Sequence, residues 1–224
     1  MKPMTTIRRS TVIINSIVLG FALLVPFANP SATIRTQPKA SPSTSTGASA
    51  QHPPRKRRTL RKPDVIYYPT PPETVAEMLR MAKIEKGDVL YDLGSGDGRI
   101  PIAAATQYGI RAVGIEIDPK LVSEATAKAE QAQVSGLVRF RNEDMFRIDV
   151  SEATVVTLYL SEKLNVMLRP KLLKELRPGS RILSHDFRMG DWKPEQTVRV
   201  PWGKLYRTVY LWTVPQPTKS GRRR

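Results

Sequence analysis

The chain of 224 residues contains no cysteine and only two histidines. The missing thiols exclude disulfide bonds, thiolate catalysis and cysteine-ligated metals. A metal site built from histidine is disfavoured too, because His52 and His185 are far apart in the sequence and metal centres usually draw on clustered ligands. We therefore expect a protein without a disulfide framework and without a metal ion.

Acidic residues are missing from both ends of the chain. Residues 1–62 hold 11 Lys/Arg and no Asp/Glu, and residues 215–224 hold 4 Lys/Arg and no acid. The remaining residues 63–214 therefore hold 21 basic and 20 acidic residues, a net charge of +1, although the whole chain carries +16. Because the basic excess lies in the terminal segments, nucleic acid is not the expected partner of the central part.

A run without any charge lies near the N-terminus. Residues 11–27 contain Asn15 as the one strongly polar side chain, and 17 residues are at the short limit of a membrane span. The same run also fits the apolar region of a signal peptide, but the following Ala28-Asn29-Pro30-Ser31-Ala32 is a poor cleavage site because proline occupies its middle. We interpret residues 1–30 as a hydrophobic membrane anchor or signal segment. The preferred interpretation is an uncleaved anchor with the folded domain facing the cytoplasm, whereas a cleaved signal would make the protein secreted or periplasmic.

The composition changes twice more along the chain. Residues 31–62 are rich in Ser, Thr, Pro and Ala and become basic at Arg55-Lys56-Arg57-Arg58, which predicts a disordered basic linker. Residues 215–224 form a short basic tail. Residues 63–214 remain as the folded domain.

Within that domain, apolar β-prone segments alternate with helical ones. We expect strands at residues 89–93, 112–116, 137–141, 154–160 and 181–184, and a closing antiparallel pair at 198–200 and 205–214. We expect helices at residues 73–82, 100–106, 119–132 and 162–176. This order predicts an α/β fold, a doubly wound, Rossmann-like, seven-stranded and mostly parallel sheet that ends in an antiparallel strand pair.

The first strand runs into a turn with three alternating glycines, Gly94, Gly96 and Gly98. Glycine permits a sharp bend with positive φ and a close approach of bare backbone to a ligand. The amides at the start of the following helix would favour a polar or anionic group. The turn therefore predicts a site for a nucleotide-like ligand.

Two other strand ends should meet this turn at the carboxyl edge of the sheet. Glu116 ends the second strand, 24 residues after Asp92, where a carboxylate can accept hydrogen bonds from ribose hydroxyls. Asp144 and Met145 follow the third strand and offer an acceptor for an adenine amino group and an apolar cover for its ring. An exposed strand-end acid and a solvated turn are the alternatives.

The glycine spacing separates the candidate cofactors. Dinucleotide sites carry G-x-G-x-x-G, whereas the third glycine here comes one residue early. Asp92-Leu93-Gly94-Ser95-Gly96-Asp97-Gly98-Arg99 resembles motif I of the seven-strand methyltransferases that use S-adenosylmethionine. The resemblance implies that Asp92 and the backbone of Gly94, Ser95, Gly96 and Gly98 approach the methionine part of the cofactor. It further implies that Glu116 holds the ribose and that Asp144, with Met145, meets the adenine.

A narrower resemblance rests on four segments: 68–71, 92–99, 157–160 and 177–184. They are similar to the small protein-lysine methyltransferases that include an archaeal broad-specificity enzyme and the enzyme acting on the ATP synthase c-subunit. This implies that Tyr68 and Thr70 lie near the cofactor. From its position after the fourth strand, Tyr159 would line the acceptor channel, with a buried aromatic on the strand as the alternative. Asp186, just past the fifth strand, is a rival acceptor-site residue, with a capping role as its alternative. Enzymes that methylate bases or glutamine usually carry Asp/Asn-Pro-Pro-Tyr/Phe after the fourth strand, and this chain has Thr157-Leu158-Tyr159-Leu160 there.

The sequence thus predicts an S-adenosylmethionine-dependent methyltransferase, most simply a protein-lysine N-methyltransferase with Tyr68 and Tyr159 at the reacting amine. Its expected partners are a protein substrate and, through the N-terminal segment, a membrane. A small-molecule methyltransferase of the same fold and a non-enzymatic cofactor-binding module are the alternatives.

Overall fold

A computed structural model of the chain describes residue 60 and residues 62–216. The expected anchor at 1–30, nearly all of the expected linker at 31–62 and most of the basic tail lie outside the described residues. None of the helices in the described part is long and apolar enough to cross a membrane. Attachment to a membrane through residues 11–27 therefore stays a prediction.

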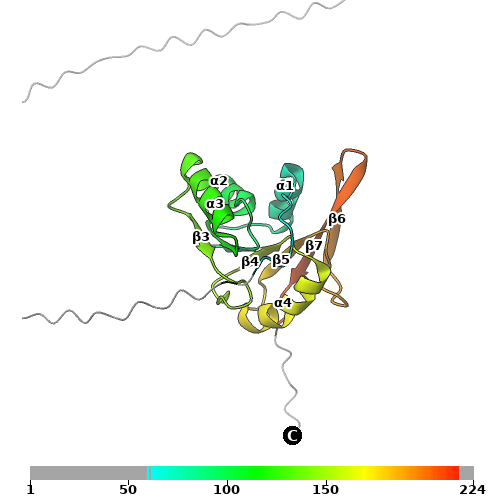
Figure 1. Cartoon of the computed structure of the whole chain (residues 1–224). Coiled ribbons are helices and arrows are strands. Elements are labelled where there is room, and N and C mark those ends of the chain that lie inside the picture. The colour runs from blue at the N-terminus through cyan, green and yellow to red at the C-terminus, as the bar shows by residue number, and fades with distance from the viewer. Residues whose placement is uncertain (1–59, 61, 217–224) are drawn as a thin grey trace, which may run out of the picture. The chain divides into compact units, whose positions relative to one another are not determined.

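The described residues form a seven-stranded sheet in the order β3-β2-β1-β4-β5-β7-β6 (Figure 1). Its strands are β1 Val89–Leu93, β2 Arg111–Glu116, β3 Val138–Asn142, β4 Val155–Leu158, β5 Arg181–His185, β6 Gln196–Trp202 and β7 Leu205–Thr213. The first five pair in parallel, and β7 pairs antiparallel with both β5 and β6. The predicted fold is confirmed.

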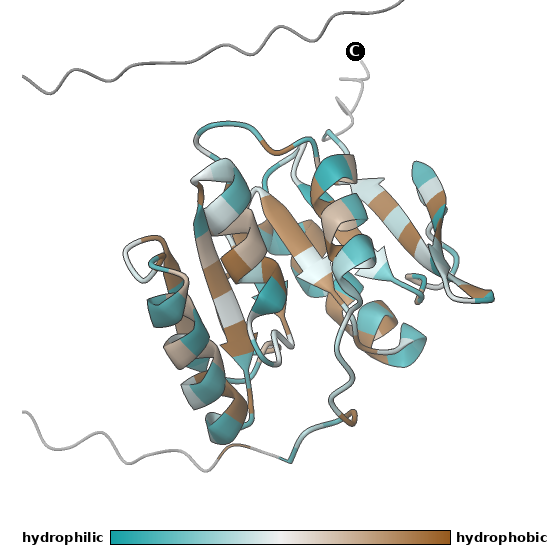
Figure 2. Ribbon diagram, turned by 90° about the horizontal axis from the view of Figure 1, so that it is seen from above, coloured by the Kyte–Doolittle hydropathy of each residue, from teal (hydrophilic) through white to brown (hydrophobic). Residues whose placement is uncertain are grey.

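Helices cover both faces of the sheet. Three of them, α1 Pro72–Met81, α2 Arg99–Tyr108 and α3 Pro119–Gln131, lie on one face, and α4 Glu162–Glu175 lies on the other (Figure 1). Seen from above, hydrophobic residues concentrate along the central strands, while hydrophilic ones mark much of the helix surfaces (Figure 2). Each face of the sheet therefore has its own apolar core.

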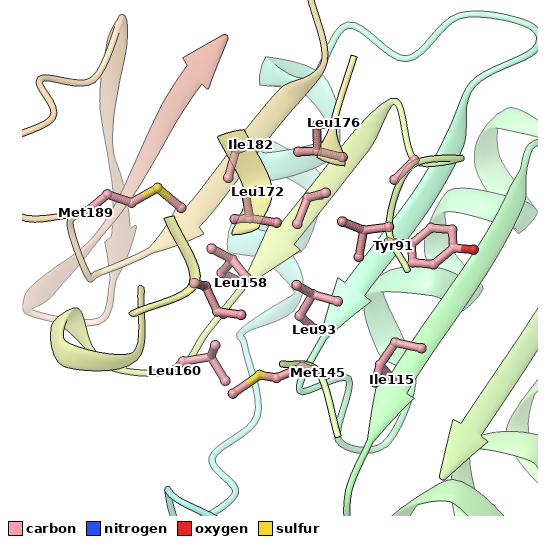
Figure 3. Packing of buried hydrophobic residues seen from close by; sticks show 14 of the residues in the cluster. Tyr91, Leu93, Ile115, Met145, Leu158, Leu160, Leu172, Leu176, Ile182 and Met189 are labelled. Atoms are coloured by element: carbon pink, nitrogen blue, oxygen red, sulfur yellow. The ribbon is translucent and has the colours of Figure 1, made fainter. Parts of the chain in front are cut away.

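Strand β1 contributes side chains to the cores on both faces of the sheet. All five of its residues are buried, and successive side chains point to opposite faces. Leu90 packs in the core under α1 and α2, whereas Tyr91 and Leu93 pack with Leu158 and Leu172 on the α4 side (Figure 3). Burial on both faces explains why the strand is a continuous apolar run interrupted by a single carboxylate, Asp92.

Most predicted boundaries differ from the structure by one or two residues, and two differences matter. Strand β4 ends at Leu158 instead of residue 160, so Tyr159 lies in the loop before α4 and not on a strand. The cause is Ser161, whose side chain accepts a hydrogen bond from the Leu164 amide and starts α4. Helix α3 ends at Gln131 instead of residue 132, and Gln133 follows it with φ of 58°, the left-handed conformation that commonly ends a helix.

Candidate functional site

A pocket of about 430 Å³ opens at the carboxyl ends of β1 and β4. The strand order reverses between these two strands, and such a switch point is where open α/β sheets bind ligands. The walls come from the turn after β1, the ends of β2 and β3, the loop after β4, and residues 63–70, which precede α1 and are called the strap below. The volume suits a single small cofactor together with part of a second substrate.

The pocket brings together most of the residues that the sequence singled out. Nine of them line it: Tyr68, Thr70, Asp92, Gly94, Ser95, Glu116, Asp144, Met145 and Tyr159. They come from five separate parts of the chain. Gly96 and Gly98 are not among the lining residues.

The second and third glycines instead allow the turn to pack. Gly96 has φ of 52°, and a Cβ there would lie 2.3 Å from Cε2 of the Tyr67 ring. Gly98 precedes α2 with φ of 79°, and its Cβ would lie 2.3 Å from Cζ of Phe140 on β3. Both positions require glycine for backbone conformation and close packing. They place the turn between the strap and the sheet, beneath the pocket wall.

The amides of the turn are occupied within the protein. Those of Gly94 and Ser95 donate to the Ile115 carbonyl at 2.8 and 3.0 Å. At the start of α2, the Asp97 carboxylate already accepts from the Arg99 side chain and lies 3.4 Å from the Arg99 amide. A carboxylate of the protein therefore lies at this helix end, where the sequence predicted a polar or anionic ligand group.

Carboxylates dominate the charge of the pocket. Seven acidic residues line it, Asp64, Asp92, Asp97, Glu116, Asp118, Glu143 and Asp144, against the single basic residue Arg99. Such a wall disfavours the pyrophosphate of a dinucleotide and favours a ligand with positive charge. S-Adenosylmethionine carries a positively charged sulfonium and an ammonium group, so it fits a pocket lined by carboxylates.

Asp92 is the most deeply buried of these carboxylates. The Thr157 hydroxyl donates to its Oδ1 at 2.7 Å. Burial raises the pKa of Asp92 to about 7, the hydrogen bond from Thr157 opposes the rise, and the charges of Glu116 and Asp97 add to it. A cationic group in the pocket would favour the ionised form, so this carboxylate is suited to hold one.

Glu116 has a fixed orientation at the end of β2. Its Oε2 accepts from the Gly96 amide at 2.9 Å, and its Oε1 accepts from the amides of Ile117 and Asp118 at 2.8 and 2.9 Å. An ionised carboxylate has about four acceptor positions, two on each oxygen, so Oε2 retains one for a ligand. This buried, preorganised acceptor fits the ribose role that the resemblance implies, and it is not the exposed strand-end acid of the alternative.

The strap is held to the turn by a charged cluster that sequence reasoning missed. Arg99 Nη1 donates to the Thr70 carbonyl at 2.8 Å, and the same guanidinium contacts Asp97. Lys128 on α3 donates to Asp97 at 2.6 Å. Burial opposes ionisation of Asp97, but the hydrogen bonds from Arg99 and Lys128 hold its pKa well below the usual range. The only sign of this cluster in the sequence is the pair of opposite charges at Asp97 and Arg99, two residues apart.

His185 is a second residue whose place the sequence did not predict. It is fully buried at the end of β5, and its ring stacks on Tyr159 with centroids 3.8 Å apart. Its Nδ1 is hydrogen-bonded to the Thr70 hydroxyl at 3.2 Å. Burial lowers the pKa of His185 to about 4. The positive charge of Arg207 lowers it further, while the negative charge of Asp186 opposes the shift. The ring is therefore neutral near pH 7. His185 thus joins the strap to the aromatic wall of the pocket.

Asp186, the rival acceptor-site residue, does not line the pocket. Its Oδ1 accepts from the Thr208 amide at 2.8 Å, and its Oδ2 accepts from Arg207 at 3.0 Å. These bonds join the end of β5 to the start of β7. The carboxylate therefore has the structural, capping role that was the alternative.

Comparisons with known proteins agree with this geometry. Residues 92–196 match the family model of the ANTKMT methyltransferase domain. A protein-lysine N-methyltransferase of Saccharolobus islandicus is 44% identical over 153 residues, which cover 68% of this chain and 95% of the relative. The ATP synthase c-subunit lysine N-methyltransferase of Mus musculus is 34% identical over 138 residues, which cover 62% of this chain and 55% of that relative.

Among solved structures, an RNA methyltransferase from Salinibacter ruber in complex with S-adenosyl-L-homocysteine is 51% identical, with a TM-score of 0.63. The match covers 68% of this chain and 97% of that chain. The bound product of methyl transfer agrees with the carboxylate-lined pocket described above. The chain therefore belongs to the S-adenosylmethionine-dependent methyltransferases, in the family that includes the protein-lysine N-methyltransferase of Saccharolobus islandicus.

Proposed function

We propose that this methyltransferase transfers methyl groups to the side-chain amine of lysine in a protein. The likeness to the Saccharolobus islandicus protein-lysine N-methyltransferase, at 44% identity over 95% of its length, carries the proposal. The pocket supports it, because Tyr68 and Tyr159 line it together with the carboxylates. The two rings are suited to guide a slender lysine side chain to the cofactor.

The bound cofactor supplies an electrophilic methyl group on a positively charged sulfur. The protein's own contribution is alignment: Asp92 and Glu116 hold the cofactor, and the strap and Tyr159 guide the acceptor. Correct alignment of two reactants supplies roughly 7 to 11 kcal/mol of a barrier. A dedicated general base in the pocket is therefore not required.

The acceptor amine must nevertheless lose its proton. A lysine with a pKa of about 10.4 loses it at pH 7 at a cost of roughly 4 to 5 kcal/mol. The positive sulfur of the bound cofactor and the aromatic wall lower the pKa of the amine and reduce that cost. Burial raises the pKa of Tyr159, so its hydroxyl stays protonated and its oxygen can accept a hydrogen bond that orients the neutral amine.

An RNA acceptor is the second candidate, favoured by the solved relative from Salinibacter ruber, which is described as an RNA methyltransferase. Two features favour lysine instead. The loop after β4 reads Tyr159-Leu160-Ser161 and lacks the Asp/Asn-Pro-Pro-aromatic motif of many base methyltransferases. Residues 63–214 are also almost neutral, whereas RNA sites are usually basic.

We also propose that residues 11–27 tether the enzyme to a membrane, with the catalytic domain on the cytoplasmic side where the cofactor is made. The uncharged sequence of this segment supports the tether. Protease protection in sealed vesicles tests the topology. Complete degradation of the domain by protease added to the cytoplasmic face is expected, and protection of the domain there would refute it.

The acceptor is tested by incubating the full chain with methyl-labelled cofactor, a membrane-protein fraction and total RNA. We expect label in protein, on lysine, as shown by mass spectrometry of the labelled band. Label in RNA or in the low-mass fraction would refute the proposal in favour of the corresponding acceptor. A Glu116→Ala variant is the control: it should bind the cofactor more weakly in calorimetry and lose the label.

A further inference from the structure

The hairpin of β6 and β7 extends past the carboxyl edge of the parallel strands. The pairing of β5 with β7 ends at His185 opposite Val209, while β6 and β7 stay paired through Trp202 and Leu205. Four residues of β7 therefore continue beyond β5, which is about 13 Å of extended chain. Figure 1 shows this hairpin at the end of the sheet. Its tip rises at the edge where the pocket opens.

The tip exposes large apolar side chains. Trp202, Leu205 and Tyr206 are 36%, 63% and 55% exposed, and Tyr68 of the strap is 52% exposed. These four residues are called the aromatic ridge below. The Arg207 guanidinium connects two of them, since it lies 4.0 Å from the Trp202 ring and 5.8 Å from the Tyr68 ring. Because Tyr68 also lines the pocket, the ridge is continuous with the opening.

The charge of the hairpin has one sign. Residues 196–208 contain Arg199, Lys204 and Arg207 and no acidic residue, although residues 63–214 as a whole are balanced. Arg207 is paired with Asp186 at 3.0 Å, so the exposed Arg199 and Lys204 supply the positive charge at the surface of the hairpin. Arg199 lies 4.5 Å from the Tyr206 ring, beside the ridge. Such a surface complements an anionic one.

The mixture of side chains favours a lipid surface over RNA. Trp and Tyr prefer the membrane interface, and Lys and Arg beside them are attracted to anionic headgroups. Leu205 has no flat face for stacking on bases, and it is the most exposed member of the ridge. The uncharged run at residues 11–27 lies on the same chain, N-terminal to the strap.

We propose that the aromatic ridge docks on the anionic surface of a lipid bilayer and thereby turns the opening of the pocket toward the membrane. This inference rests on the proposed function, since it selects lysines at a membrane surface as acceptors. Arg199 and Lys204 contact headgroups, while Leu205 and the rings enter the interface.

The absence of cysteine allows a direct test. A Leu205→Cys variant of the full chain carries one environment-sensitive fluorophore at the tip. A Ser135→Cys variant carries it on an exposed turn before β3, at the opposite edge of the sheet. Both are mixed with vesicles of phosphatidylcholine alone or with added phosphatidylglycerol, some of them containing a spin-labelled lipid. Because the label reports local contact, attachment through residues 11–27 alone does not produce the signal.

We expect a blue shift and quenching by the spin label at position 205 with the anionic vesicles, and neither at position 135. Equal signals at both positions, or no signal at 205, would overturn the proposal. A blue shift at 205 on addition of total RNA or of a substrate protein, with none from vesicles, would assign the ridge to that partner instead. Methylation of a soluble lysine peptide without vesicles is measured in parallel, so that failure of the enzyme is distinguished from failure of docking.

Discussion

Asp92 is expected to make the free protein less stable as the pH rises toward neutrality. Its pKa is raised from 3.8 to about 7, and burial is the largest cause. The folded protein therefore keeps a proton that the unfolded chain has already released, and the free energy of unfolding falls between these two pH values. The difference of about three pH units corresponds to about 4 kcal/mol, fully lost above pH 7.

The Asp92→Asn variant removes this titration. Its side-chain oxygen can still accept the hydrogen bond from the Thr157 hydroxyl, so the packing is retained. At about pH 8 we expect the variant to be more stable than the unmodified protein by about 2 to 4 kcal/mol, and near pH 4 the difference should vanish. Urea unfolding, followed by tryptophan fluorescence over a pH series, measures the stability difference at each pH.

Asp88, just before β1, is the matched control, because its pKa is shifted in the opposite direction. Burial raises its pKa, but hydrogen bonds from the Glu85 amide, Thr154 and Arg181 outweigh this and leave the pKa below its usual value. Asp88→Asn should therefore lose stability at neutral pH, and the loss should disappear as the pH falls through the lowered pKa. If Asp92→Asn and the unmodified protein gave parallel curves from about pH 5 to 8, the reasoning on Asp92 would be refuted.

The same carboxylate predicts how the cofactor binds. Positive charge in the pocket favours ionised Asp92, so affinity for S-adenosylmethionine should rise with pH up to about 7 and then level off. The Asp92→Asn variant should bind more weakly and without this pH dependence. Calorimetry at several pH values tests the prediction, and an affinity that stays flat in the unmodified protein contradicts it.

Three further substitutions probe the turn, the strap and the acceptor wall. Gly96→Ala should cost about 1 to 3 kcal/mol of stability, because φ is 52° and the new Cβ would meet the Tyr67 ring; unaltered urea unfolding would contradict this. Arg99→Gln removes the bonds to Thr70 and to the Asp97 carboxylate, so cofactor affinity should fall and limited proteolysis should cut the strap faster. Tyr159→Phe keeps the ring but loses the hydroxyl: we expect unchanged cofactor affinity and about tenfold lower kcat, equivalent to about 1.4 kcal/mol. An equal loss of cofactor affinity would place the Tyr159 hydroxyl on the cofactor side.

Local signals in the sequence were sufficient for most of the fold. Alternation of apolar strands with helical segments predicted the sheet. The start of α3 at residue 119 was predicted as well, and the side chain of Asp118 caps it by accepting from the Lys120 amide. The end of β4 was less predictable. Apolar residues continue to Leu160, and the capping bond of Ser161 ends the strand at Leu158 before that run is complete.

The sequence by itself determined the cofactor class, because the glycine spacing after Asp92 and the carboxylate at Glu116 are local features with fixed positions in a parallel sheet. Only the tertiary structure decided what those residues do to one another. It packs Gly96 against Tyr67 and Gly98 against Phe140. It also places the Asp97 carboxylate at the N-terminal end of α2 and buries Asp92 deeply enough to raise its pKa. It further places His185, the last residue of β5, against Tyr159 in the loop after β4. The physical reason is that burial, stacking and charge coupling depend on distances between segments far apart in the chain, which periodicity and spacing do not encode.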